Sequence, residues 1–265
     1  LALAATAALP QFAHAQAYPS KPITFVVPFA AGSATDQLAR ALGQSVGDQS
    51  KQPVIVDNKG GASGMIAAAQ VAKAAPDGYT VLITTNTTHA ANEHLYKKLS
   101  YDPVKDFAPI TGLGKGGQVL VVRTDAPYKN VMNLVAAAKK TPGKLSFGSG
   151  SSSSRRAGER FKQLSGTDIL HVPYKSNPNA ITDLLGGNVD LLFAPLPEAL
   201  PYLKSGKLSA LALMSDKRSP LITDVPTMRE AGIPNMVMQT WIGLLAPAGT
   251  PRPLVNQLNR QVHAI

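Results

Sequence analysis

Two short stretches of the chain combine small residues with hydroxyl groups where a strand-like run gives way to a helix-like one. The stretches are PFAAGSATDQLARAL at residues 28–42 and FGSGSSSSRRAGERF at residues 147–161. The first turn of a helix leaves backbone N–H groups without partners inside the helix, and the helix dipole makes that end positive. A carboxylate or a phosphate binds well at such a position. Each stretch therefore predicts a turn that holds an anion.

Helix capping explains part of this composition. Ser33, Thr35 or Asp36 is expected to cap the first helix, and one serine of residues 151–154 the second. One cap needs one hydroxyl group, so the remaining serines exceed that need, and the glycines let a ligand approach the backbone closely. We therefore expect both turns to wrap an anion, mainly through neutral donors.

Adjacent arginines follow the second turn. Arg155 is expected to donate a charge-assisted hydrogen bond to the anion, while Arg156 faces solvent. The alternative for Arg155 is an ion pair with Glu159, four residues further along the helix. The sequence leaves both possibilities open.

The chain lacks the usual motifs of an enzyme. There is no G-x-S-x-G elbow, and His171 lies in a strand-like run, ILHVPY, which favours a structural role over that of a base for the serines. Residues 112–117 fit G-x-G-x-x-G, but a strand-like segment follows them instead of a helix, so we interpret them as a flexible connection. The five histidines lack metal-ligand spacing. We expect no catalytic residue, no metal and no cofactor.

The charge and composition favour a protein that attracts small anions. The 265 residues are 44% hydrophobic, enough for one large core or two modest ones. Lys and Arg outnumber Asp and Glu by 26 to 16, which gives a net charge of +10, but the basic residues are scattered and not interleaved with aromatic ones. This pattern favours a basic surface over a nucleic-acid groove. The absence of cysteine excludes disulfides and thiolate metal sites.

The first residues, LALAATAALPQFAHAQA at 1–17, form a short apolar stretch that ends in small residues spaced like a cleavage site. We interpret them as the remnant of a secretory signal peptide, with the mature chain starting near Gln16 or Tyr18. An apolar N-terminal helix is the alternative, but Pro10 and the short length disfavour it, and the stretch is too short to span a membrane. The mature protein is expected to be exported.

Apolar runs of strand length alternate with helix-like segments along the rest of the chain. The runs are residues 23–27, 53–56, 80–84, 118–122, 145–147, 169–172, 189–193 and 208–213. Such alternation predicts an α/β protein whose mainly parallel sheets are covered by helices on both faces. No low-complexity linker divides the chain. Any division into lobes must therefore pass through strands, which we place near residues 118–122 and 239–244.

The order of these segments resembles that of a known family. The segments that carry the resemblance, besides the serine turn, are YPSKPITFVVPFAAGSATDQLAR (18–40), VDNKGGASGMIAA (56–68), APDGYTVLI (75–83), HVPYKS (171–176), DLLGGNVDLLF (183–193), LKSGKLSALAL (203–213), DVPTMREAGIP (224–234) and WIGLLAPAGTPRPLVNQLN (241–259). Taken in order, they resemble the solute-binding proteins of tripartite tricarboxylate transporters, also called the Bug family. The resemblance covers essentially the whole chain after residue 17.

The resemblance implies a two-lobed α/β periplasmic binding protein of type II. Each lobe would have a mainly parallel sheet flanked by helices, and two strands would cross between the lobes. Lobe 1 would comprise residues 18–117 plus 240–265, and lobe 2 residues 118–239. The family resemblance further implies a small carboxylate ligand, delivery to the large and small permease subunits of a membrane transporter, and a periplasmic location in a Gram-negative bacterium. We expect a monomer that binds no nucleic acid.

The same resemblance places the ligand in the cleft between the lobes. The loop of residues 29–36 would hold its carboxylate from one lobe, partly through ordered water, and the loop of residues 149–155 from the other. The expected ligand-binding residues are Phe29, Ala30, Ala31, Gly32, Ser33, Thr35, Asp36, Thr85, Ser149, Gly150, Ser153, Ser154, Arg155, Tyr174 and Ala194.

The chain departs from the family pattern at several places. Residues 153–156 replace a commoner asparagine-and-histidine version of the second turn, and Ala194 stands where many relatives carry aspartate. Without that carboxylate to pair with an ammonium group, we expect a mono- or dicarboxylate and not an amino acid. The apolar residues 194–196 and Phe29 suit an aromatic body such as terephthalate. The sequence stops at Ile265, before the family's usual final helix, so a longer chain is expected.

Two other functions stay open on the sequence. A periplasmic binding protein also serves as the ligand-sensing part of a signalling system. An exported hydrolase using one of the clustered serines is a further alternative, although such an enzyme needs a base within hydrogen-bond reach of its nucleophile.

Overall fold

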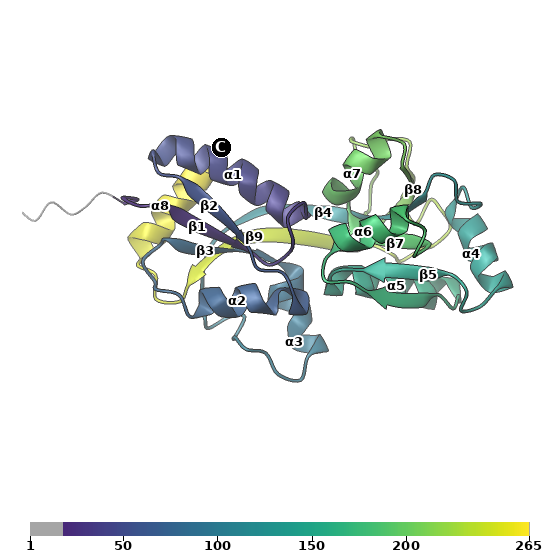
Figure 1. The fold of residues 1–265 in the computed structure, drawn as a ribbon, viewed down its shortest axis with the longest axis horizontal. Coiled ribbons are helices and arrows are strands. Elements are labelled where there is room, and N and C mark those ends of the chain that lie inside the picture. The colour runs from purple at the N-terminus through teal and green to yellow at the C-terminus, as the bar shows by residue number, and fades with distance from the viewer. Residues whose placement is uncertain (1–17, 265) are drawn as a thin grey trace, which may run out of the picture.

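A computed structural model describes residues 18–264 and shows an elongated α/β protein with two lobes (Figure 1). The long strands β4 (Phe107–Arg123) and β9 (Gln239–Pro247) run from one lobe into the other. The two-lobed α/β fold expected from the sequence is thus confirmed. The expected signal remnant at residues 1–17 lies outside the described residues.

The first lobe holds the N-terminal elements and the C-terminal helix. These are β1 (Ile23–Val27), α1 (Ala34–Ser50), β2 (Val54–Asn58), the 3₁₀-helix η1 (Ala62–Gly64), α2 (Met65–Ala72), β3 (Thr80–Thr85), the π-helix η2 (Thr87–Ala91), α3 (Asn92–Leu95) and α8 (Arg252–His263). Helix α1 begins where Ser33 caps it by accepting the N–H of Asp36, as the sequence indicated. It ends at Lys51, which takes a left-handed conformation.

The second lobe holds the middle of the chain. Its elements are α4 (Val131–Lys140), β5 (Ser146–Ser149), α5 (Ser152–Ser165), β6 (Leu170–Pro173), α6 (Asn177–Leu185), β7 (Leu191–Pro195), α7 (Leu196–Lys204) and β8 (Leu208–Leu213). Ser151 caps α5, and Gly166 ends it with a left-handed φ of 63°.

The strands form one mixed, curled sheet in the order β2-β1-β3-β9-β4-β7-β5-β6, with β8 paired to β4. The outer strands are parallel, as expected: β1 pairs with β2 and β3, and β5 pairs with β6 and β7. The crossing strands β4 and β9 pair antiparallel with their neighbours. This follows from the connectivity, because a strand that returns from the second lobe runs against the strand that led there.

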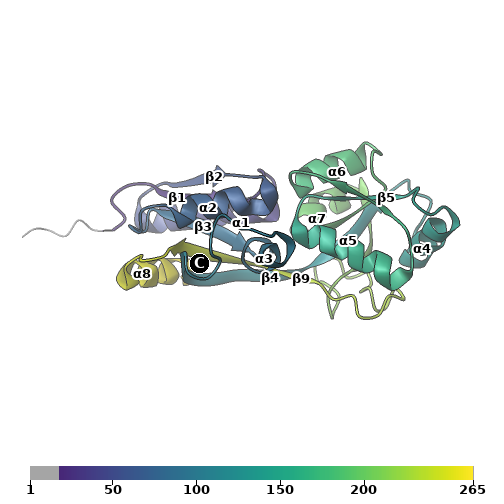
Figure 2. The same ribbon diagram turned by 90° about the horizontal axis from the view of Figure 1, so that it is seen from below.

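The crossing strand β4 corrects one sequence interpretation. Residues 112–117 were expected to be a flexible connection, but they lie inside β4 and pair with β9. In Figure 2 the two strands lie beside each other as they leave the first lobe. The partner of β4 changes from β9 at Gly117 to β7 at Gln118. The proposed lobe boundaries at residues 117 and 239 stay a prediction.

Helices cover both faces of the sheet in each lobe. In the first lobe, buried residues of α1 and α8 pack on one face and those of α2 on the other. In the second lobe, α4 and α5 cover one face, and α6 and α7 the other. Within residues 18–264, no helix has the length and apolar character to cross a membrane. The same residues contain no cluster of three acidic or histidine side chains suited to a metal ion.

Candidate functional site

A cavity of about 530 Å³ lies where the two lobes and the crossing strands meet. Its walls come from the turn before α1, the end of β3, β4, the start of α5, the β7–α7 junction, the segment after β8, and β9. Most of the lining is apolar, and includes Phe29, Leu38, Leu113, Pro195, Leu196, Leu213, Leu221, Trp241 and Ile242. Such a concave, largely apolar space with a few polar groups is typical of a small-molecule site.

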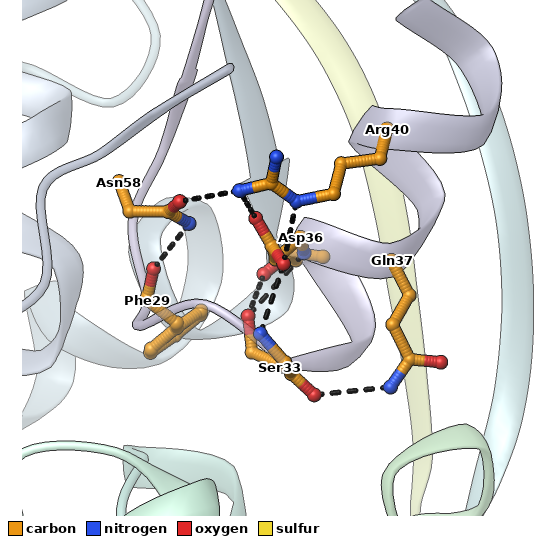
Figure 3. A network of polar contacts seen from close by, with 8 residues as sticks. Phe29, Ser33, Asp36, Gln37, Arg40 and Asn58 are labelled. Carbon is orange, nitrogen blue, oxygen red and sulfur yellow. Dashed lines mark hydrogen bonds and ion pairs between the residues drawn. The ribbon is translucent and has the colours of Figure 1, made fainter. Parts of the chain in front are cut away.

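The turn before α1 is braced by residues of α1 and by Asn58 of β2 (Figure 3). The N–H of Gly32 donates to Asp36 Oδ2 at 2.9 Å, and Arg40 lies 3.0 Å from the other oxygen of the same carboxylate. Asn58 accepts from Arg40 at 3.2 Å and donates to the carbonyl of Phe29 at 3.0 Å. Burial by itself would raise the pKa of Asp36, but the hydrogen bonds from Arg40 and Gly32 outweigh it and hold that pKa below its ordinary value.

The turn before α5 is held by a neighbouring helix. Asn177, the first residue of α6, accepts from the N–H of Gly150 at 2.9 Å and from the hydroxyl of Ser154 at 3.0 Å. A Cβ atom on Gly150 would lie 1.8 Å from the carbonyl carbon of Ser176. The glycine of this turn is therefore required by its packing against α6.

Three hydrogen bonds join the lobes across the cleft. The N–H of Ala34 in α1 donates to Glu198 Oε1 of α7 at 2.9 Å. Thr87 of η2 bonds to Ser153 of α5 through their hydroxyl groups at 2.9 Å. The hydroxyl of Ser152 donates to Asn92 Oδ1 at 3.2 Å. The starts of α1 and α5 thus face the opposite lobe.

Several buried polar atoms of the cavity lining have no hydrogen-bond partner among the described residues. They are both amide atoms of Gln118, Oδ1 of Asn86 and Oε2 of Glu198. An unsatisfied buried polar atom costs about 1–3 kcal/mol, so proteins retain few of them without a reason. These atoms give the cavity hydrogen-bonding capacity that the described residues do not use.

The charges around the cavity are unevenly distributed. Lys115 and Lys217 line it, and Glu198 is the sole acidic residue of the lining within residues 18–264. Burial raises the pKa of Glu198 to about 7, against the opposing effects of the Ala34 N–H and of the nearby Asn177 side chain. The two lysines and a carboxyl group that resists ionisation make the cavity favourable for an anion.

A comparison with known families decides what kind of protein has this cleft. Residues 38–264 match the model of the family described as the tripartite tricarboxylate transporter family receptor. The chain belongs to this family. The resemblance seen in the sequence is thus confirmed.

Solved structures of similar proteins share the receptor's fold. The periplasmic binding protein BugD is 37% identical, with a TM-score of 0.89 over 93% of the receptor and 83% of BugD. Rpa4515 from R. palustris, solved with adipate, is 36% identical, with a TM-score of 0.91 over 93% of the receptor and 83% of that chain. MatC from Rhodopseudomonas palustris, solved with bound malate, is 35% identical, with a TM-score of 0.88 over 93% of the receptor and 85% of that chain.

The receptor brings part of the expected ligand-binding set to the cavity. The members that line it are Phe29, Thr35, Thr85 and Ser153. In the first turn, Gly32 and Asp36 bond to each other, Ser33 caps α1, and Ala30 and Ala31 complete the loop without lining the cavity. Ligand contact by any member of the set stays a prediction.

The remaining members lie in the second lobe, outside the cavity lining. Ser154 and Gly150 bond to Asn177, and Tyr174 donates to Asp183 at 2.8 Å. Ala194 is buried in β7, while its neighbours Pro195 and Leu196 line the cavity. Arg155 is exposed on α5, and Glu159 pairs with Lys162 at 3.4 Å instead of with Arg155.

One expected member, Ser149, has a partner that sequence reasoning did not find. His171 Nε2 lies 2.6 Å from Ser149 Oγ, although no base was expected near the serines. The pair does not line the cavity, Ser149 is only 5% exposed, and no carboxylate in residues 18–264 bonds to the other ring nitrogen of His171. A hydrolase needs an accessible nucleophile and an oriented base, so the pair supports a structural role.

Sequence reasoning missed the polar residues that most distinguish the cavity. Glu198, Gln118 and Asn86 carry its unpartnered atoms, and none of them was a candidate. For Glu198 a signal existed: APLPEAL follows an apolar strand and opens a helix, as the two serine- and alanine-rich turns do. Gln118 gave a weaker signal as the polar start of the apolar run QVLVV.

Proposed function

We propose that this receptor captures a small carboxylate in the cleft between its lobes and delivers it to the membrane subunits of a tripartite tricarboxylate transporter. The observation that carries the proposal is the cavity of about 530 Å³ set between the starts of α1 and α5. The N–H groups in the first turns of these helices lack carbonyl partners within the helix and favour an anion. The carboxylates bound to Rpa4515 and MatC support the same ligand class.

A dicarboxylate with a sizeable apolar body suits the cavity best. One carboxylate would lie near Thr35 and Ser153, at the two helix starts. The unpartnered Nε2 group of Gln118 would then donate to the second carboxylate. Between these ends, side chains such as Phe29 supply an apolar wall. Terephthalate and adipate, each with two carboxylates on a rigid or flexible hydrocarbon body, are the ligands we propose to test first.

The surroundings of Trp241 provide a direct measurement of binding. Trp241 is the single tryptophan of the chain, lines the cavity on β9 and is 39% exposed. We expect its fluorescence to change when a dicarboxylate fills the cavity. Titration with benzoate, adipate, malate, terephthalate and citrate, repeated by calorimetry, would rank the ligands. A Trp241→Phe variant that loses the optical signal but keeps the calorimetric one is the control.

The proposed ligand class fails if none of these carboxylates binds by either method. Tighter binding of amino acids than of dicarboxylates would also contradict it, because Ala194 offers no charge to an ammonium group and Glu198 resists ionisation. A thermal shift provides a third check, since a ligand at about 100 times its dissociation constant stabilises the folded state by about 2.7 kcal/mol.

Delivery to a transporter and action as a periplasmic monomer form the second part of the proposal. The family match and the periplasmic relative BugD support them. The test is uptake of radiolabelled ligand by cells that carry the permease subunits with and without the receptor. Uptake that does not depend on the receptor would remove the transport role while leaving ligand binding intact.

A further inference from the structure

Glu198 places a carboxyl group at a helix start that the proposed function assigns to the ligand anion. It lies in the first turn of α7, and its Oε1 accepts the N–H of Ala34 at 2.9 Å. Ala34 is the first residue of α1, so this N–H is one of the donors without an intrahelical carbonyl. The contact joins residues 164 positions apart in the sequence and spans the cleft.

The second carboxyl oxygen of Glu198, Oε2, has a different environment from Oε1. Oε2 is buried and forms no hydrogen bond of ordinary geometry within residues 18–264, although the side chain of Asn177 lies near enough to the carboxyl group to lower its pKa, and the residue as a whole is 6% exposed. Glu198 nevertheless lines the cavity. A buried carboxylate with one unpartnered oxygen is costly, whereas a protonated carboxyl group carries an O–H donor there that needs only one acceptor.

Within residues 18–264, no cation forms an ion pair with this carboxyl group. The charged or titratable residues on the surrounding elements include Asp36 and Arg40 of α1, His89 of η2, Lys115 of β4, Asp183 of α6 and Lys217 after β8. Arg40 is paired with Asp36, and Asp183 accepts from Tyr174. Burial lowers the pKa of His89 to about 4, so its ring is neutral at neutral pH. None of these six forms an ion pair with Glu198 in the described part of the chain.

A ligand carboxylate at the start of α1 would approach this group closely. Two negative carboxylates that share one helix start repel each other, as in carboxylate pairs where one pKa is strongly raised. A protonated Glu198 avoids the repulsion, because its carbonyl oxygen keeps the bond from Ala34 while its O–H donates to a ligand oxygen. A hydrogen bond between a neutral acid and a carboxylate is of the strong, charge-assisted kind.

We propose that Glu198 is a specificity-determining residue of this site, which binds the ligand carboxylate in its protonated form, so that capture of the anion takes up one proton from solvent. No covalent bond forms or breaks, and the proton is retained on Glu198 while the anion is bound. The inference rests on the proposed function and deepens it. It selects anionic acceptors over ammonium donors at this end of the cavity.

The sign of the pH dependence follows from this scheme. Burial raises the pKa of Glu198 to about 7, and a bound anion raises it further. Below about pH 7 the group is already protonated, so affinity is constant and no proton is taken up. Above that pH, binding must protonate it, and affinity falls by about tenfold per pH unit until the pKa of the complex is reached.

The test is calorimetric titration of the whole protein with adipate at pH values of about 6, 7 and 8.5, in buffers of different ionisation enthalpy. We expect proton uptake near zero at the lowest pH and close to one at the highest. In the Glu198→Gln variant, whose amide can both accept and donate, we expect binding without proton uptake and with little pH dependence. Glu159→Gln, an exposed acid on α5 outside the cavity, should behave like the unaltered protein.

The outcomes separate this inference from the proposed function. Adipate binding without proton uptake in the unaltered protein at about pH 8.5 overturns the role of Glu198 alone, even if the Glu198→Gln variant fails to fold. Unchanged proton uptake in a folded Glu198→Gln variant also overturns it. If adipate, malate and terephthalate all fail to bind at every pH, the proposed function falls, and the inference falls with it.

Discussion

The turns that begin α1 and α5 look alike in sequence but are held in place differently. The α1 turn is braced internally, because the N–H of Gly32 donates to Asp36 at 2.9 Å. The α5 turn is tied to another helix, because Gly150 and Ser154 both donate to Asn177. The first turn is thus held by contacts within its own lobe, and the N–H of Ala34 at its end reaches Glu198 across the cleft. The second turn depends on α6 for its shape.

The glycines of the two turns show the same difference. Gly32 has φ of +82°, and a Cβ atom there would meet nothing within 4 Å. A Cβ atom on Gly150 would overlap the backbone of Ser176 and Asn177. The same residue type therefore serves conformational freedom in one turn and close packing in the other.

The largest expected effect breaks this packing. Gly150→Ala should lower the free energy of unfolding by about 3 kcal/mol or more, because α5 and α6 must move apart to admit the methyl group. Gly32→Ala should lower the free energy of unfolding by about 1–2 kcal/mol, because a residue with a Cβ atom is strained in the left-handed conformation that Gly32 adopts. Urea unfolding of both variants measures the difference. Equal losses would show that close packing does not distinguish the two turns.

The second prediction concerns Glu198, whose carboxyl group bonds to the start of α1 and not to the turn before α5. It is tested by measuring the free energy of unfolding as a function of pH. Glu198 has a folded pKa of about 7 against 4.5 in its ordinary state, raised by burial. Because the folded state favours the protonated form, its contribution is complete below pH 4.5 and is lost as pH rises to about 7. Relative to Glu198→Gln, the unaltered protein should lose about 3 kcal/mol over this range. Parallel stability curves for the two proteins would mean that Glu198 ionises as freely in the fold as in the unfolded chain.

Hydroxyl deletions sharpen the comparison further. Thr35 lines the cavity, so Thr35→Ala should weaken dicarboxylate binding by about 1 kcal/mol, and because its buried hydroxyl lies 3.0 Å from Ser33 Oγ, the free energy of unfolding should also fall by about 1 kcal/mol. Ser154 is buried and bonds to Asn177, so Ser154→Ala should lower the free energy of unfolding by about 1 kcal/mol. Calorimetric binding and urea unfolding of both variants separate the two effects. If Ser154→Ala weakened dicarboxylate binding and Thr35→Ala did not, the ligand would lie against the α5 turn instead.

The smallest effect concerns the arginines after the second turn. Arg155 and Arg156 are both exposed on α5. Replacement of either by glutamine should weaken anion binding by less than about 0.5 kcal/mol, and the loss should vanish at high salt as long-range attraction is screened. Titrations at two salt concentrations measure this. A larger, salt-resistant loss for Arg155→Gln alone would restore the direct ligand contact predicted from the sequence.

The alternation of apolar runs with helices was sufficient to predict the α/β architecture, because each strand and its neighbouring helix carry their own periodicity. Residues 112–117 were misassigned because glycine is a poor strand former, and only the ladder with β9 makes them a strand. That pairing is tertiary and leaves no local trace in the sequence.

The candidate site, like the strand pairing, could be predicted only where the signal is local in the sequence. The helix starts of α1 and α5 were recognisable from their caps and small residues, and Thr35 and Ser153 do line the cavity. The roles of Asn177 and Glu198 depend on contacts across 27 and 164 positions of the chain. No spacing rule connects such distant residues, so these partners became visible only when the fold placed them together.

The crossing strand β4 also has a bare stretch of backbone where it passes the cavity. Gly114 and Gly116 are two positions apart and lie on one face of the strand, and a Cβ atom on either would meet nothing within 4 Å. Both line the cavity. A side chain at either position would project from the strand without meeting another atom. The crossing strand therefore presents bare backbone to the cavity at these two positions, so bending it toward that side would compress no side chain there.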